Sequence, residues 1–233
     1  MTWVAGLTWE AVERELASGS AAILPIGAGA KEHGLHLPMN TDQIQAEWLA
    51  ERLAGAIGAL VWPPLLYGYY PAFDEFPGGV GLTRSTFAAL VLETMREILK
   101  WKPRRLYILD TGLSTIEPID EAIAETKGGD GVVHLKIHDG PRYRAAATRI
   151  MEQAFGSHAD ELETSCMLVI APAKVDMTKA VATPGGPFER PLTRGNAPSG
   201  SYGDPTRATT GKGHELLDAM IADLIETCEL RLR

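Results

Sequence analysis

Short apolar segments alternate with amphipathic segments along most of the chain. Residues 21–26, 59–66 and 105–109 are short apolar runs, typical of strands buried on both faces, and residues 131–138 alternate well enough for a fourth strand. Amphipathic patterns predict helices over residues 10–17, 43–57, 86–100, 141–154, 160–170 and 215–230, with another after residue 118. Strands joined by connections of about a dozen residues or more are typical of a parallel sheet. The alternation therefore predicts an α/β fold in which helices cover both faces of a mainly parallel central sheet.

We expect residues 1–233 to form a single domain, because no internal repeat or low-complexity segment interrupts the pattern. Residues 183–207 are rich in Pro, Gly, Ser and Asn, which predicts a long surface loop. Polar loops at residues 27–42, 68–79 and 110–118 each follow the end of a predicted strand. Open α/β sheets bind ligands at that edge, so a functional site is expected there.

The composition excludes several classes of protein. Lys and Arg number 22 against 30 Asp and Glu, a formal net charge of −8, which argues against nucleic-acid binding. Two cysteines exclude a disulfide framework, and Cys166 sits in an apolar helical pattern typical of the core. The N-terminal segment lacks the basic region of a signal peptide, and no apolar run reaches the roughly 18 residues of a membrane span. We therefore expect a cytoplasmic protein that does not contact membranes.

The loop at residues 27–42 holds the densest cluster of chemically active side chains, namely Lys31, Glu32, His33, His36 and Asp42. Carboxylate and imidazole together are the ligand set of zinc, manganese or iron, and a carboxylate can bridge two ions. Gly34 and Pro38 favour a fixed, non-helical path that lets such side chains converge. The alternative is that Asp42 only caps the following helix and Glu32 is a solvated charge.

A second cluster lies at residues 157–165 and contains His158, Asp160, Glu161 and Glu163. His158 and Glu161 are three residues apart, so they share a face if the helix has already begun. Acidic residues are also favoured in the first turn of any helix by the helix dipole. A well-capped helix start is therefore the alternative to a functional role.

The sequence GAGAKEHGLHLPMNTD and the later HADELETSCML resemble two motifs of the creatininase (creatinine amidohydrolase) family. These motifs are E-x-H-G-x-H-L-P-x-x-x-D and H-A-G-E-x-E-T-S, and Phe76-Pro77-Gly78 is similar to the family's F-P-G. The resemblance covers about residues 20–180. It implies a three-layer αβα sandwich, commonly oligomeric, that hydrolyses C–N bonds of cyclic or formylated amides with one or two divalent metal ions.

The resemblance also assigns roles to individual residues. His33 and Asp42 match metal ligands, with Asp42 as the bridging carboxylate, and Glu161 matches the glutamate that completes the site. His158 matches the catalytic histidine, while Glu163 is expected to orient ligands or bind substrate. The family glutamate two residues before the histidine is Lys31 here.

If the motif is counted from Gly29 instead, Glu32 takes the place of that glutamate, and we favour Glu32 because an ammonium group has no lone pair to donate. His36 matches the second histidine, which either hydrogen-bonds within the loop or contacts the metal.

Two departures from the family pattern change the expected metal content. Leu113 stands where the family has a metal-binding histidine, and a leucine cannot ligate. The histidine expected in the aromatic loop is also absent. Asp110 or Asp160 could supply another carboxylate. We therefore expect one divalent ion, zinc, manganese or iron, in each chain.

Two further groups of side chains allow either a functional or a structural reading. Tyr69, Tyr70, Phe73 and Phe76 could floor a pocket for a flat ring or simply pack the loop. His134 and His138 lie on one face of a predicted strand, where a structural role is more common than a ligand pair.

These observations predict a metal-dependent amidohydrolase that acts on a small-molecule substrate and forms a homo-oligomer, a hexamer by resemblance. One alternative is a metal-depleted relative that serves as a binding or assembly protein, suggested by Leu113 and Lys31. Another is a lactonase or deformylase that uses the same site.

Overall fold

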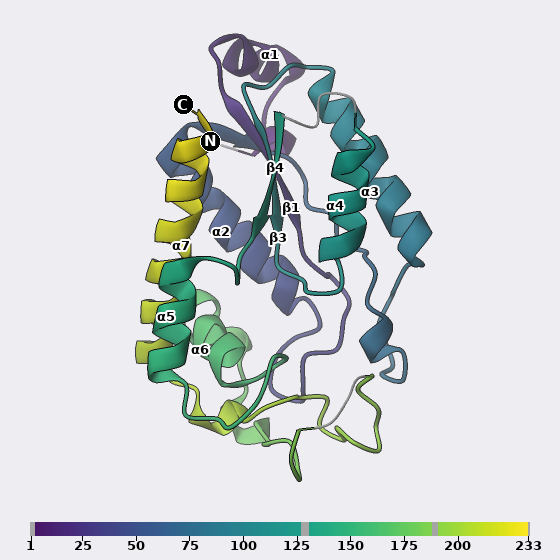
Figure 1. The fold of residues 1–233 in the computed structure, drawn as a ribbon, viewed down its shortest axis with the longest axis vertical. Coiled ribbons are helices and arrows are strands. Elements are labelled where there is room, and N and C mark those ends of the chain that lie inside the picture. Colours follow the sequence, from purple (N-terminus) through teal and green to yellow (C-terminus); the bar gives the residue numbers. More distant parts are fainter. Residues whose placement is uncertain (1–2, 127–130, 188–190, 233) are drawn as a thin grey trace.

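The computed structural model describes residues 3–126, 131–187 and 191–232. Its centre is a four-stranded sheet in the order β2-β1-β3-β4, with every neighbouring pair parallel (Figure 1). The strands are β1 Ala21–Ile26, β2 Ala59–Val61, β3 Leu106–Asp110 and β4 Val132–Lys136. The parallel sheet predicted from the sequence is confirmed.

Helices cover both faces of this sheet, as expected for a three-layer αβα sandwich (Figure 1). One face packs against α2 (Thr41–Ile57), α5 (Pro141–Ile150), α6 (Glu161–Ile170) and α7 (Thr210–Leu232). The other packs against α3 (Arg84–Leu99) and α4 (Ile116–Ala124), while α1 (Trp9–Ala17) lies at one end. Short 3-10 turns occupy Val4–Gly6, Pro71–Phe73, Pro172–Lys174, Met177–Lys179 and Pro205–Arg207.

Strand β1 shows why an uninterrupted apolar run forms the middle of the sheet. Successive side chains of a strand point to opposite faces. Ala21 and Ile23 accordingly join the core beneath α2 and α7, while Ala22, Leu24 and Ile26 join the core beneath α3. Both faces are covered, so every one of its six residues is buried.

Several predicted boundaries were wrong for identifiable reasons. Strand β2 ends at Val61 rather than at residue 66, because Pro63 and Pro64 have no N–H to donate to a ladder. Helix α5 ends at Ile150, not residue 154, and α7 begins at Thr210, not residue 215. Neither Thr41 nor Asp42 caps α2: both lie inside its first turn, and Asn40 precedes it.

Gly27 brings the beginning of α2 against the end of β1. A Cβ atom at Gly27 would lie 2.5 Å from the carbonyl oxygen of Asp42, so no larger residue fits without a shift. The N–H of Gln43 also donates to the carbonyl of Ala28 over 3.2 Å. This close approach holds the first turn of α2 beside the loop that follows β1.

The predicted surface loop at residues 183–207 is only partly at the surface. Ala197, Ser199 and Ser201 are buried. A Cβ atom at Gly200 would lie 1.9 Å from Oε1 of Glu32, so the loop covers the side chains that follow β1. Residues 188–190 of this loop lie outside the described residues.

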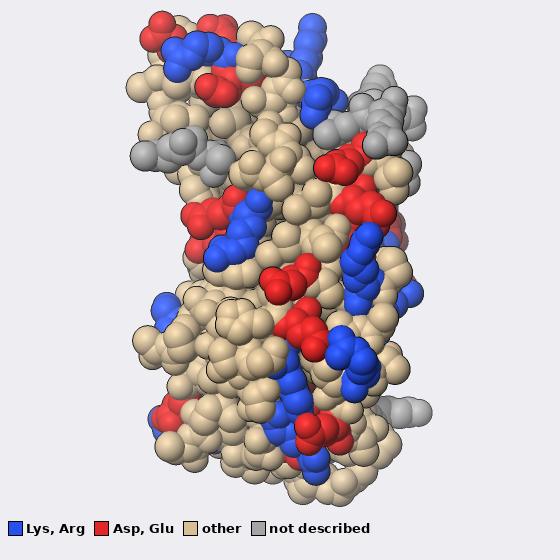
Figure 2. Space-filling view, turned by 90° about the vertical axis from the view of Figure 1, so that its left-hand side faces the viewer, with Lys and Arg blue, Asp and Glu red and all other residues tan. Residues whose placement is uncertain are grey.

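The molecular surface carries mixed charge. Figure 2 shows the side on which α7 lies in Figure 1, with basic and acidic side chains interspersed rather than gathered in one basic patch. Ion pairs such as Arg142–Glu226 and Arg149–Glu215 join α5 to α7. Within the described ranges, no helix is long and apolar enough to cross a membrane.

Candidate active site

His33 lies in the loop after β1 with its two ring nitrogens in different surroundings. Nδ1 lies 2.9 Å from the carbonyl oxygen of Lys31, and a carbonyl can only accept, so Nδ1 carries a proton. Nε2 faces Oδ1 of Asp42 at 3.0 Å and Oε1 of Glu163 at 3.8 Å. Although burial opposes the charged form of this ring, Asp42 raises the pKa of His33 above its ordinary value. Two carboxylates thus face Nε2, an arrangement that needs a proton or, in its place, a metal cation between them.

Asp42 is buried in the first turn of α2, and its two oxygens have different partners. Oδ1 faces His33, while Oδ2 lies 2.6 Å from Nζ of Lys31. Burial by itself would raise the pKa of Asp42, but the charges of Lys31 and His33 outweigh it and hold the pKa well below its usual range. Asp42 is therefore ionised at neutral pH.

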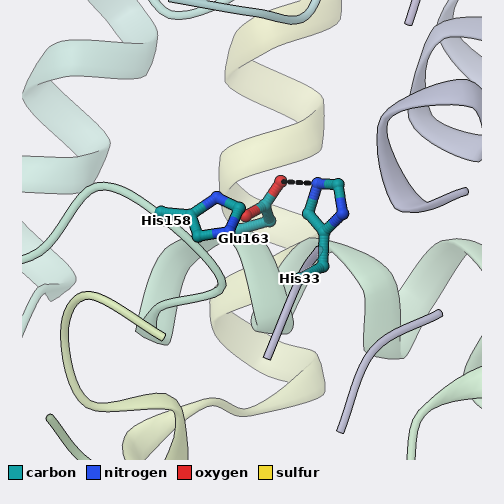
Figure 3. A group of neighbouring side chains, drawn as sticks. All are labelled: His33, His158 and Glu163. Atoms are coloured by element: carbon teal, nitrogen blue, oxygen red, sulfur yellow. Dashed lines mark ion pairs between the residues drawn. The ribbon is translucent and has the colours of Figure 1, made fainter. Parts of the chain in front are cut away.

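Glu163 enters the group from the first turn of α6. Its Oε1 accepts a hydrogen bond from Nε2 of Gln45 at 3.0 Å, and its Oε2 accepts one from the N–H of Ala159 at 2.7 Å. Burial opposes the charged form, but the charges of His33, His158 and Lys31 together outweigh it, and the pKa of Glu163 is lowered. His33, His158 and Glu163 each offer one ligand atom, and these atoms lie within 4.8 Å of one another (Figure 3).

His158 stands on the other side of this group and is fixed from several directions. Its Nε2 lies 3.0 Å from Oε2 of Glu32, and its ring packs on Phe73 with centroids 4.3 Å apart. The backbone of His158 pairs with that of Tyr202 in a short antiparallel bridge. Tyr202, within the predicted loop at residues 183–207, therefore lies beside the site.

Burial has opposite effects on the two members of the His158–Glu32 pair. Burial, followed by the charge of His33, lowers the pKa of His158 well below its ordinary value. Burial raises the pKa of Glu32 to about 7, although the N–H of Gly34 donates to its carboxylate. His158 is therefore neutral at pH 7, the state in which an imidazole can accept a proton.

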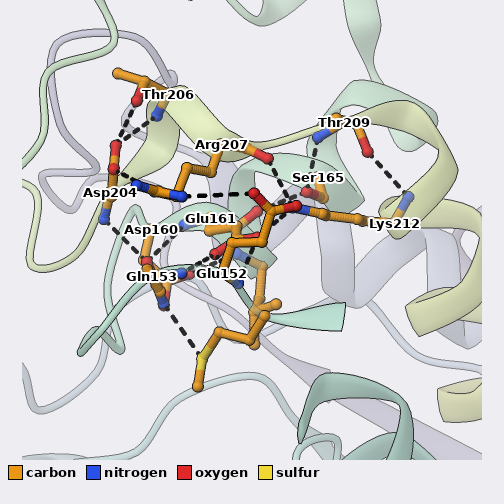
Figure 4. A network of polar contacts seen from close by, with 12 residues as sticks. Glu152, Gln153, Asp160, Glu161, Ser165, Asp204, Thr206, Arg207, Thr209 and Lys212 are labelled. Carbon is orange, nitrogen blue, oxygen red and sulfur yellow. Dashed lines mark hydrogen bonds and ion pairs between the residues drawn. The ribbon is translucent and has the colours of Figure 1, made fainter. Parts of the chain in front are cut away.

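Glu161 contacts a different group of residues from Glu163. Its carboxylate accepts hydrogen bonds from the backbone N–H groups of Glu152 and Gln153 and pairs with Lys212 of α7 (Figure 4). The structure therefore does not bring Glu161 to His33 and Asp42. Instead its carboxylate joins the segment after α5 to the beginning of α7.

A cavity of about 240 Å³ opens beside these side chains. Its lining includes Lys31, Asp42, Tyr70, Phe73, His158 and Glu163. Tyr70 and Phe73 thus line the cavity and also belong to a buried hydrophobic cluster, whereas Tyr69 and Phe76 only pack against such clusters. A packing role is therefore seen for all four residues, and a pocket for a flat ring stays a prediction.

Comparison with known proteins identifies the family. A model of the creatininase family, described as creatinine amidohydrolase, matches residues 5–228. The chain belongs to the creatininase family. Creatinine amidohydrolase of Pseudomonas putida is 28% identical over 96% of this chain and 95% of its own length. Mycofactocin precursor peptide peptidase of Mycolicibacterium smegmatis is 26% identical over 91% of this chain and 83% of its own.

Solved creatininase structures share the fold of this chain. A tryptophan-to-alanine mutant creatininase superimposes with a TM-score of 0.88, at 27% identity over 99% of this chain and 98% of the other. A structure described as creatininase Mn gives a TM-score of 0.87 at 26% identity, covering 98% of each chain. The predicted family and fold are confirmed, and the chain is an enzyme of an amidohydrolase family.

Leu113 stands in the place of the family's metal-binding histidine, and neither Asp110 nor Asp160 supplies a ligand in its stead. Leu113 lies at the edge of the cavity and is 47% exposed. Asp110 accepts hydrogen bonds from the N–H of Gly112 and the hydroxyl of Thr115, and its other oxygen faces His134. Asp160 caps α6 by accepting from the N–H groups of Leu162 and Glu163. Neither aspartate joins the group around His33.

Three histidines outside the group around His33 and His158, namely His36, His134 and His138, have structural contacts. Nε2 of His36 lies 2.8 Å from the hydroxyl of Thr164, which ties the loop after β1 to α6. Burial lowers the pKa of His36 to about 4, so its ring is neutral. His138 packs on Tyr143, and His134 lies between Asp110 and Asp120, so the two do not form a ligand pair.

Two contributors to the site had no assigned role in the sequence analysis. Gln45 holds Glu163, and it lies three residues after Asp42 on the same face of α2, a spacing that could have indicated it. Lys31 was set aside because it cannot ligate, yet its ammonium group contacts Asp42 directly.

Proposed function

We propose that this creatininase-family chain is a metal-dependent hydrolase that cleaves a C–N bond of a small or cyclic amide. One observation carries the proposal: Nε2 of His33 faces Asp42 and Glu163 beside a cavity, with neutral His158 next to it. Structures of relatives are described as creatininase Mn and as a mutant creatininase of Zn-Zn type, which supports a divalent ion of this kind here.

The donor set fits one divalent ion. One imidazole nitrogen and two carboxylate oxygens suit zinc, manganese or iron, and three protein ligands leave a position open for chemistry. We assign His33, Asp42 and Glu163 as the ligands. Glu32 and Glu161, which the sequence favoured, instead contact His158 and Lys212, respectively.

In the proposed reaction, the oxygen of water bonds to the carbonyl carbon, the C–N bond breaks and the leaving nitrogen takes a proton. A bound divalent ion supplies Lewis acidity, which makes water more acidic and polarises the carbonyl oxygen. His158 accepts the proton from water through its neutral ring and passes it to the leaving nitrogen. Glu32 and Phe73 hold the ring in place for both transfers.

A second candidate substrate is a peptide. The mycobacterial relatives named as peptide peptidases support it, because a peptide bond is also an amide C–N bond and requires the same chemistry. N-formyl compounds and lactones would use the same residues. A substrate screen therefore has to include each of these classes.

The test is a side-by-side screen of creatinine, other cyclic amides, short peptides, N-formyl compounds and lactones with zinc- or manganese-loaded protein. We expect hydrolysis of an amide that is lost after chelation and in His158→Ala. His214→Ala, a histidine of α7 outside the cavity lining, is the matched control and should keep full activity. Metal-loaded protein without activity on any amide would contradict the proposal.

We further propose that the chain acts as a single-domain, cytoplasmic homo-oligomer, a hexamer by family resemblance. Packing of α7 against α2 and α5 supports the single domain, because it joins the end of the chain to its beginning and middle. Light scattering during gel filtration measures the number of subunits directly.

A further inference from the structure

The carboxylate of Asp42 lies between two positions that each favour a positive charge. Oδ1 faces the group formed by His33 and Glu163, which is the proposed metal position. Oδ2 faces Nζ of Lys31 at 2.6 Å. A carboxylate that bridges two cations gives one oxygen to each, and Asp42 has that arrangement with an ammonium group on one side.

The ammonium group of Lys31 is deeply placed for a lysine. The residue is 8% exposed, and a buried lysine is rare unless it is paired. Asp42 is the carboxylate paired with it within the described residues. The rings of Phe73 and Tyr70 lie 5.1 and 5.6 Å from Nζ, so cation–π attraction adds to the ion pair.

We propose that the ammonium group of Lys31 is a built-in second cation, which takes the place of a second metal ion beside Asp42. The inference rests on the proposed function, which places a metal ion beside His33 and Oδ1 of Asp42. A relative is described as of Zn-Zn type, whereas this chain then holds one metal ion and one ammonium group. Unlike a metal ion, the ammonium group is covalently attached and is not removed by a chelator.

The loop after β3 agrees with this assignment because residues 111–115 contain no carboxylate, imidazole or thiol side chain. Leu113 lines the same cavity but has no donor atom. The hydroxyl of Thr115 donates to Asp110 instead. A second ion on the Oδ2 side of Asp42 would therefore have to displace Lys31 and would gain little from this loop.

Metal content in each chain tests the inference without any substrate. Untagged protein is stripped of metal with a chelator and dialysed against excess Zn²⁺ or Mn²⁺, and its metal content is measured by elemental analysis. Anomalous difference maps from crystals of the same protein locate each ion. We expect one ion per chain, in contact with His33, while Nζ of Lys31 remains beside Asp42. Two ions, or an ion on Oδ2 of Asp42 with Lys31 displaced, would overturn the inference but leave the proposed hydrolase intact.

Variants of Lys31 supply the complementary test. Lys31→Glu replaces the cation with a ligand, so we expect the metal content to rise from one to two ions per chain. Lys174→Glu, at an exposed lysine, is the matched control, and its metal content should remain at one ion per chain. Lys31→Asp, which also replaces the cation with a carboxylate ligand, is used if Lys31→Glu does not fold. A folded acidic variant of Lys31 that stays at one ion contradicts the inference, and wild-type protein without metal contradicts both this inference and the proposed function.

Discussion

The carboxylates of Glu161 and Glu163 begin the same helix two residues apart, yet they serve different parts of the molecule. Residues two apart on a helix are about 200° apart around its axis, so their side chains diverge. Glu163 faces His33 and Gln45, whereas Glu161 faces Lys212 and the N–H groups of residues 152 and 153. One position belongs to the candidate site and the other to the scaffold behind it.

This relationship predicts opposite phenotypes for two matched substitutions. Glu163→Gln removes a charged ligand, so metal affinity should fall by about 100-fold or more, with little change in the melting temperature of the metal-free protein. Glu161→Gln should keep metal affinity but lose about 2 kcal/mol of stability, because Lys212 loses its buried partner. Isothermal titration with Zn²⁺ and thermal unfolding in a chelator separate the two effects. Equal loss of metal affinity in both variants would contradict the assignment.

His158 is expected to act in proton transfer rather than in metal binding. His158→Ala should therefore lower kcat by about 100- to 10,000-fold while the metal content per chain stays unchanged. Elemental analysis and steady-state kinetics on the same preparation provide both readouts. Loss of the metal together with activity would instead place His158 among the ligands.

The pH dependence of stability reports on Glu32. Burial raises the pKa of this carboxyl to about 7 from an ordinary value of 4.5, so the folded protein keeps the proton in the range where the unfolded chain has lost it. The stability from Glu32 is therefore fully present below pH 4.5 and is lost as the pH rises through 7, by about 3 kcal/mol in total.

Glu32→Gln removes this titration. We expect the stability of metal-free wild-type protein to decline between pH 5 and about pH 8 relative to that of the variant. Urea unfolding of both proteins at each pH measures the difference. Parallel curves would show that Glu32 is ionised throughout.

Gly200 is expected to be needed for both stability and activity, for two separable reasons. Its φ of +82° is unfavourable for other residues, and a Cβ atom there would lie 1.9 Å from Oε1 of Glu32. Gly185 has a similar φ of +80° but no atom within 4 Å of such a Cβ.

Both alanine variants should therefore lose about 1–2 kcal/mol from backbone strain. Only Gly200→Ala should also displace Glu32 and lower kcat through His158. Thermal unfolding and kinetics on the pair distinguish strain from displacement, and equal kinetics in the two variants would contradict the role of Gly200.

The fold was largely predictable because its central strands are buried on both faces. The apolar run at 21–26 coincides with β1, since burial on both sides demands apolar residues throughout. Element boundaries that depend on local chemistry, such as the end of β2 before Pro63, were predicted less accurately. The helix predicted over residues 160–170 begins one residue later, because Asp160 caps it and so stands just before its first turn.

The site was predictable only in part, because its geometry depends on side-chain directions within short segments. Motif spacing identified the loop of His33 and Asp42, which do face each other. It could not show that neighbouring Lys31 and Glu32 contact different partners, Asp42 and His158. Asp42 lies in the helix that follows, whereas His158 and Gly200, which contact Glu32, lie far away in the sequence.

The backbone bridge between His158 and Tyr202 has a consequence for how the protein matures. Because the partner of His158 follows the whole of α6 in the sequence, a chain growing on the ribosome can complete its sheet before that partner has been made. Helix α7, which covers one face of that sheet, follows Tyr202 in the sequence and is made last. Completion of the core and fixing of the proton-transfer residue should therefore both be late events, which follow synthesis of nearly the whole chain.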